Sequence, residues 1–85
     1  MKWFVYVLAC EDGSYYVGAT MDVVRRFREH CDGTGGAYTR SHRPLKVLFQ
    51  ESHPDRSSAL RREREIKNWS RQKKQALVIS VCHAS

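Results

Sequence analysis

The sequence predicts an α+β domain in which strands and helices follow one another in the order β-β-α-β-α-α. Residues 2–10 are rich in Val, Tyr, Phe and Trp with little polar alternation, which is typical of a strand covered on both faces. Turn residues and a second aromatic run follow directly, which predicts a hairpin. Further along the chain, apolar residues recur at the spacing of helices and of one more strand.

The turn of the hairpin decides which side chains share a face of the sheet. A two-residue turn at Asp12-Gly13 would pair residues whose numbers sum to 25, and would place Tyr6 and Tyr16 on opposite faces. A three-residue turn with Gly13 in the bulge position gives a sum of 24 and places both tyrosines on one face. The second strand runs through residues 15–19 in either case.

A first helix is expected after Thr20, which is a suitable N-cap residue, with Asp22 in its first turn. Its apolar stripe consists of Val23, Val24, Phe27 and Cys31. Arg26 and His30 are four residues apart and line one edge of that stripe. The segment 32–43 is polar and rich in glycine, and we expect a flexible loop there.

The rest of the chain predicts one strand and two helices. The third strand alternates apolar and other residues at Leu45, Val47 and Phe49. A short helix over about residues 70–77 closes the domain. We therefore expect a single domain over residues 1–79 and a C-terminal tail over residues 80–85, because 85 residues leave no length for a second domain.

The second helix is expected over residues 56–69, with Asp55 or Ser57 at its start. One carboxylate of this helix lies at an unusual position. The apolar face of this helix holds Ala59, Leu60, Ile66 and Trp69, and Glu63 lies inside that stripe. The solvent side holds Arg61, Arg64 and Glu65. A partly buried carboxylate needs a cation, a donor or a metal, because stranding it costs several kcal/mol. An ion pair with a nearby arginine and a functional site are both consistent with this pattern.

The charge of the chain is positive and localised. Lys and Arg number 15 against 9 Asp and Glu, and the segment 56–74 carries eight of the cations with only two acids. A basic helical surface attracts nucleic acid through counterion release, and ten of the cations are Arg, whose planar fork suits phosphate oxygens. A merely solvated basic face is the alternative.

The cysteines and the hydropathy predict a cytoplasmic location. Cys10, Cys31 and Cys82 form no C-x-x-C pair, so neither a disulfide framework nor a zinc site is expected. The apolar run over residues 3–10 is too short for an export signal and is better explained as a strand. No segment approaches the length of a membrane span, so we expect no membrane association.

Two tripeptides carry a resemblance to a known family. Phe4-Val5-Tyr6, followed after nine residues by Tyr16-Val17-Gly18, resembles the paired tripeptides of the GIY-YIG nuclease superfamily, and further matching residues follow in order: Arg26, His30 and Glu63. The resemblance covers residues 3–78. Residues 35–37 and 59–63 are similar to the small stand-alone bacterial members and to the catalytic domain of the structure-specific endonucleases that cut branched DNA.

The resemblance implies a three-stranded antiparallel sheet flanked by about three helices, and hydrolysis of phosphodiester bonds with one Mg²⁺ or Mn²⁺ ion. In such a site Glu63 would bind the metal, and Arg26 would stabilise charge on the phosphoryl oxygens. Tyr6 would help to take a proton from the attacking water, Tyr16 would orient that water or the phosphate, and His30 would be an alternative base or a phosphate contact. We expect these five side chains to line one concave surface, with the hairpin in the even-sum register.

The expected partner is nucleic acid, DNA rather than RNA, with branched DNA and repair intermediates as candidate substrates. The residues expected to contact it are Arg25, Arg40, Arg43, Arg61, Arg64, Lys67, Lys73 and Lys74. No further targeting domain is expected, so substrate choice would rest on this surface or on a protein partner; the oligomeric state is open. One alternative is an inactive nucleic-acid-binding module of the same fold, since Phe4 replaces the first Gly of the family motif. Another is a basic scaffold that docks an acidic protein.

Overall fold

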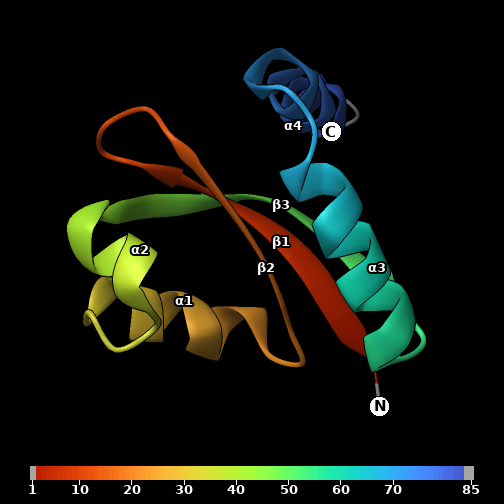
Figure 1. The fold of residues 1–85 in the computed structure, drawn as a ribbon, viewed down its shortest axis with the longest axis horizontal. Helices are drawn as coiled ribbons and strands as arrows, with labels where there is room; N and C mark the ends of the chain where they lie inside the picture. The colour runs from red at the N-terminus through yellow and green to blue at the C-terminus, as the bar shows by residue number, and fades with distance from the viewer. Residues whose placement is uncertain (1, 84–85) are drawn as a thin grey trace.

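The computed structural model describes residues 2–83, with side chains as far as Ile79, and contains a three-stranded antiparallel sheet with helices on both sides (Figure 1). Its elements are β1 (Trp3–Cys10), β2 (Tyr15–Thr20), α1 (Val23–Cys31), α2 (Ala37–Ser41), β3 (Pro44–His53), α3 (Arg56–Lys67) and α4 (Arg71–His83). The strand order is β2-β1-β3, so the apolar N-terminal strand lies in the centre as predicted. The predicted α+β class is confirmed.

The hairpin between β1 and β2 has the three-residue turn. Tyr6 pairs with Gly18 and Leu8 pairs with Tyr16, so paired residue numbers sum to 24. Gly13 has a φ of +84°, a left-handed conformation that favours glycine. The rings of Tyr6 and Tyr16 lie on the same face of the sheet, with their centroids 6.2 Å apart. The even-sum register is therefore confirmed.

The two faces of the sheet are covered by different helices. On one face, α3 and α4 pack on the sheet and form the main apolar core, which consists of Val5, Val7, Val17, Phe49, Ala59, Ile66 and Val78. The other face carries Tyr6, Leu8 and Tyr16, because side chains alternate along a strand. The helices α1 and α2 cover this second face, and α3 lies on the far side of β2 from them (Figure 1).

The first helix differs from the prediction in its cap and in its buried face. The cap is Asp22, whose side chain accepts a hydrogen bond from the Arg25 amide at 3.1 Å, whereas the Thr20 hydroxyl accepts from the Asp22 amide. Val24 is 65% exposed and Cys31 is also exposed, so the predicted apolar stripe is wrong at these two positions. The buried residue of α1 is His30.

Three further boundaries differ from the expected ones. The segment 32–43 is not entirely a loop, because it contains the short helix α2. The third strand spans ten residues, and the last helix runs to His83, which includes part of the expected tail; residues 84–85 lie outside the described range. Asp55 begins α3 by accepting from the Ser58 amide at 2.8 Å, which confirms one of its two expected starts. Within the described part of the chain, the helices are too short or too polar to cross a membrane.

Candidate active site

A buried chain of hydrogen bonds joins β1, α1 and α2. The Tyr6 hydroxyl lies 2.9 Å from His30 Nε2, and His30 Nδ1 lies 2.7 Å from the Thr39 hydroxyl. All three residues are at most 3% exposed. A neutral imidazole has one donor and one acceptor nitrogen, so a proton on Nδ1 that is donated to Thr39 leaves Nε2 free to accept from Tyr6. This tautomer gives His30 the capacity to receive the tyrosine proton.

Burial and neighbouring charges set the protonation of this chain. Burial raises the pKa of Tyr6 well above its usual value of 10; Tyr16 and the Glu63 carboxylate add to the rise, and Arg26 opposes it. Burial also lowers the pKa of His30 below its usual 6.5, and the Arg26 charge acts in the same direction. The ring of Tyr16 meets that of His30 edge-on at 4.8 Å between centroids. Tyr6 and His30 are therefore both neutral near pH 7.

Two glycines make room for these side chains. A methyl group added at Gly18 would lie 2.5 Å from the Tyr6 hydroxyl oxygen, so the phenol ring rests directly against the backbone of β2. A methyl group at Gly35 would lie 2.5 Å from His30 Nδ1 and 2.8 Å from its backbone nitrogen. Gly35 is buried against α1, so flexibility is not its function, contrary to the expectation for this segment.

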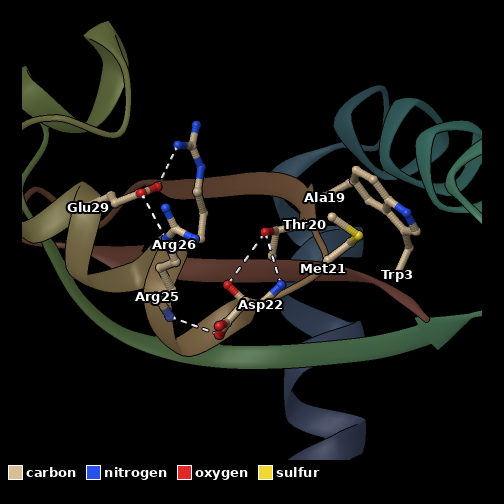
Figure 2. A pocket seen from close by; sticks show the side chains of 8 residues that line it. All are labelled: Trp3, Ala19, Thr20, Met21, Asp22, Arg25, Arg26 and Glu29. Carbon is tan, nitrogen blue, oxygen red and sulfur yellow. Dashed lines mark hydrogen bonds and ion pairs between the residues drawn. The ribbon is translucent and has the colours of Figure 1, made fainter. Parts of the chain in front are cut away.

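Arg26 is held in place by two hydrogen bonds. Its Nη1 donates to Glu29 at 2.9 Å, and its Nη2 donates to the carbonyl oxygen of Gly35 at 2.7 Å. Arg25 also pairs with Glu29, at 3.5 Å (Figure 2). These side chains line a cavity of about 370 Å³ between the end of β2 and α1, together with Trp3, Ala19, Thr20, Met21 and Asp22. Arg26 thus presents a fixed cation at one end of the Tyr6 site.

Glu63 lies on α3, in the layer opposite to that of His30. Its helix, α3, packs on the other face of the sheet through Ala59 and Ile66, yet its charge contributes to the raised pKa of Tyr6. The Glu63 side chain is only 16% exposed, and Lys67 Nζ lies 3.7 Å from it. The ion pair considered from the sequence is therefore made with a lysine, not with an arginine. Arg62 pairs instead with Glu51 and Glu65.

The donor chemistry at Glu63 fits a hard divalent cation with few protein ligands. Within residues 2–83, no group of three His, Cys, Asp or Glu side chains converges to hold a metal. A carboxylate oxygen is nevertheless the ligand that Mg²⁺ and Mn²⁺ prefer, and such ions commonly complete their coordination with water and substrate phosphate. Glu63 would be the protein ligand in such a site.

The cations expected to bind nucleic acid are spread over several surfaces. Arg61 and Arg64 line a groove of about 310 Å³ on the outer side of α3, and Arg25 lines the cavity beside Arg26. Lys67 and Lys74 line a groove of about 290 Å³ whose other walls are Tyr15, Tyr16, Val17 and Tyr38. Exposed side chains outside these grooves are Arg40, Arg43 and Lys73. The Lys73 ammonium lies 4.4 Å from the Trp69 ring centroid.

Sequence reasoning missed Thr39, Tyr38 and the packing of Gly35. All three belong to the segment that was expected to be a loop. Their contacts arise from tertiary structure, because α2 folds back onto His30 and Tyr16. The only sequence clue was the resemblance of residues 35–37 to the family, and that clue carried no side-chain role.

Comparison with known families identifies the family of this chain. The family model described as the GIY-YIG catalytic domain matches residues 2–76. This chain belongs to the GIY-YIG family. The family is a nuclease superfamily, and GIY-YIG nucleases generally use divalent metals.

Relatives of this GIY-YIG domain have a similar size. A UPF0213 protein of Staphylococcus saprophyticus is 43% identical over 77 residues, which cover 91% of this chain and 94% of the relative. The solution NMR structure of a UPF0213 protein from Bacillus halodurans is 44% identical, covers 92% of this chain and 83% of that one, and has a TM-score of 0.59. A solution NMR structure from E. faecalis is 36% identical, covers 100% and 90%, and has a TM-score of 0.62.

Proposed function

We propose that this protein is a metal-dependent endonuclease that hydrolyses phosphodiester bonds in DNA. The observation that carries the proposal is the Tyr6 hydroxyl, which is hydrogen-bonded to a neutral His30 and lies within the electrostatic influence of Glu63 and Arg26. Titratable groups whose pKa values are shifted by burial and by neighbouring charges are enriched at catalytic sites, and both Tyr6 and His30 are shifted in this way.

Proton transfer in this site would run through Tyr6 to His30. Tyr6 is protonated in the free protein because burial raises its pKa, so it accepts a proton from the attacking water only if its own proton moves to His30 Nε2. The lowered pKa of His30 keeps the imidazole neutral and able to accept. The Thr39 hydroxyl can accept the Nδ1 proton in the tautomer that this transfer needs.

The remaining groups would act on charge and position. Glu63 would hold Mg²⁺ or Mn²⁺, and such an ion would supply polarisation of the phosphate and stabilisation of the leaving oxygen. The charge of the ion would offset the negative charge of Glu63, which helps to raise the pKa of Tyr6. Arg26, fixed by Glu29 and Gly35, would stabilise charge on the phosphoryl oxygens. Tyr16, packed against His30, would orient the water or the phosphate.

The alternative of an inactive nucleic-acid-binding module fits the site less well. A binder needs arginines and lysines, whereas a carboxylate beside the site repels phosphate unless a cation lies between them. The scaffold that docks an acidic protein likewise gives no reason for the buried pair of Tyr6 and His30.

A cleavage panel tests the proposal. Labelled linear, flapped and branched DNA of matched sequence is incubated with the protein in Mg²⁺, in Mn²⁺ and in EDTA, beside the Glu63→Ala variant. The proposal expects cleavage of at least one substrate that requires the metal and Glu63. Binding without cleavage under all conditions would favour the inactive module. An RNA panel of the same shapes decides between DNA and RNA.

A further inference from the structure

A groove beside the Tyr6 site has the composition of a binding surface for unpaired nucleotides. Its volume is about 290 Å³, and its walls come from β2, α2, α3 and α4. We call it the tyrosine groove and define it by Tyr15, Tyr16, Val17, Tyr38, Lys67 and Lys74. Aromatic side chains interleaved with cations are the combination by which proteins bind single-stranded nucleic acid without sequence preference.

Tyr38 is held rigidly although it is exposed. The His42 ring stacks on the Tyr38 ring at 4.1 Å between centroids and 8° between planes. His42 is itself fixed, because its Nδ1 lies 3.0 Å from the Tyr38 carbonyl oxygen and its Nε2 lies 3.5 Å from Asp12 Oδ2. Tyr38 nevertheless lines the groove and is 39% exposed. A pre-positioned aromatic ring loses little conformational entropy when a base stacks on it.

The groove is continuous with the candidate active site at two points. Tyr16 lines the groove and also contacts His30, at 4.8 Å between ring centroids, and its ring lies 5.7 Å from that of Tyr38. On the other side, Lys67 lines the groove and pairs with Glu63 at 3.7 Å. A strand whose phosphate lies at Tyr6 and Glu63 would therefore place its next nucleotide in the tyrosine groove.

We propose that the tyrosine groove binds one unpaired nucleotide adjacent to the scissile phosphate, with Tyr38 as the platform on which its base stacks. The preferred substrate is then DNA with a single-stranded segment at the cleavage position, and its phosphates are neutralised by Lys67 and Lys74. A base in an intact duplex has both faces occupied by its neighbours and cannot use Tyr38. This inference rests on the proposed nuclease function for the position of the scissile phosphate, whereas the binding preference is measurable by itself.

Binding measured without divalent metal tests the groove separately from cleavage. A labelled hairpin with a short single-stranded flap, whose two strands are joined by a non-nucleotide linker in place of a loop, is compared with the blunt hairpin of the same duplex sequence and linker, by fluorescence anisotropy in EDTA. Wild-type protein is expected to bind the flapped hairpin more tightly. Tyr38→Ala is expected to weaken flap binding about 5- to 150-fold, the range measured for loss of one stacked base, and to leave blunt-duplex binding unchanged. Tyr38→Phe keeps the ring and should bind as wild type does.

Leu45→Ala is the matched control, because it removes an exposed apolar side chain, 57% exposed, from the opposite edge strand β3. It should change neither affinity. Equal losses on both hairpins for Tyr38→Ala, or no preference for the flap in wild type, would overturn the inference.

A second measurement uses only wild-type protein, so it remains informative if Tyr38→Ala does not fold. Wild-type protein labelled with ¹⁵N is titrated with an oligonucleotide of four thymidines. Amide shifts are expected to concentrate at residues 15–17, 38, 67 and 74. Shifts confined to the outer side of α3, at Arg61 and Arg64, would contradict the groove. If the protein cleaves DNA and Tyr38→Ala changes neither cleavage nor flap binding, only this inference is wrong. If flap binding depends on Tyr38 but the protein cleaves no substrate, only the proposed nuclease activity is wrong.

Discussion

Thr39 holds the inner nitrogen of the His30 ring, although it contacts no substrate in the proposed reaction. Its hydroxyl is the partner of His30 Nδ1. Thr39→Val keeps the shape and removes that partner, which leaves a buried imidazole nitrogen unsatisfied and costs about 1–3 kcal/mol of stability. In this variant the tautomer that accepts from Tyr6 loses the acceptor for its Nδ1 proton, so we expect cleavage to fall about 100-fold, the lower end of what a positioned acid–base group contributes.

The measurement for Thr39 is a pH–rate profile of wild type, Thr39→Val and Thr39→Ser. Serine restores the hydroxyl and should restore most of the rate, whereas a merely structural role would leave the shape of the profile unchanged in all three proteins. If Thr39→Val cleaves at the wild-type rate, the hydrogen bond between Thr39 and His30 has no influence on the reaction.

The buried His30 makes the stability of the folded protein depend on pH. Burial lowers its pKa in the folded state, so the unfolded chain binds more protons as the pH falls below 6.5. His30 therefore contributes stability that is present above pH 6.5 and is lost as the pH falls from there toward the lower folded pKa. We expect the Tm of His30→Gln to fall less than that of wild type across this range. His53→Gln is the control, and an identical pH dependence in His30→Gln and wild type would contradict the buried neutral imidazole.

At the scale of elements, the hairpin and its register were predictable because a turn has few options. Only two turns fit Asp12-Gly13, and one of them places Tyr6 and Tyr16 together. The helix α3 was predictable from its apolar spacing and from Asp55, and Glu63 stood out against that spacing.

The short helix α2 could not be predicted, because glycines precede it and no side chain caps its start. It is held by the hydrogen bond from Thr39 to His30 and by the ring contacts of Tyr38, which are visible only in three dimensions. The sequence also does not reveal that His30 is buried and Val24 is exposed, because the burial of His30 depends on tertiary contacts. A polar ring is stable in the interior only when both its nitrogens have partners, and the sequence does not reveal those partners.

Gly18 gives a prediction about the packing of β2 on β1. In Gly18→Ala, the new methyl group would lie 2.5 Å from the Tyr6 hydroxyl oxygen and 2.6 Å from its ring carbon Cζ, so the Tyr6 ring must move. We expect a loss of about 1–3 kcal/mol in the free energy of unfolding, measured in urea, together with loss of cleavage. Tyr6→Phe should lose cleavage while keeping the fold, because it removes only the hydroxyl. Unchanged stability and cleavage in Gly18→Ala would show that the Tyr6 ring is not packed tightly against β2.

At the scale of the whole molecule, the formal charge of +6 is distributed over several grooves and not over one patch. Binding to duplex DNA should therefore weaken steeply with salt, with a slope of about −0.9 for each phosphate that is neutralised. Arg61→Glu with Arg64→Glu should weaken binding to all sequences alike and lower that slope, since phosphate contacts carry no base readout. The measurement is a series of binding isotherms at increasing salt.

Lys46→Glu is the control for this charge reversal, because Lys46 is an exposed cation on β3, at the opposite edge of the sheet from β2. Salt-independent binding of the wild-type protein to duplex DNA would contradict contact with the phosphates.

The partly buried carboxylate of Glu63 serves a metal and not the fold in the proposed reaction. Its one ion pair among the described residues is with Lys67, whose side chain is 52% exposed, and such a pair contributes little to stability. Glu63→Gln keeps the size of the side chain and removes the charge, whereas Glu65→Gln makes the same change at a residue on α3 that is 53% exposed.

The most direct test measures cleavage in Mg²⁺, DNA affinity in EDTA and Tm without metal for wild type, Glu63→Gln and Glu65→Gln. We expect that Glu63→Gln abolishes cleavage, binds DNA equally or more tightly, and melts at the wild-type temperature or above it, while Glu65→Gln cleaves at the wild-type rate. A Glu63→Gln protein that melts at a markedly lower temperature and still cuts at the wild-type rate would contradict it.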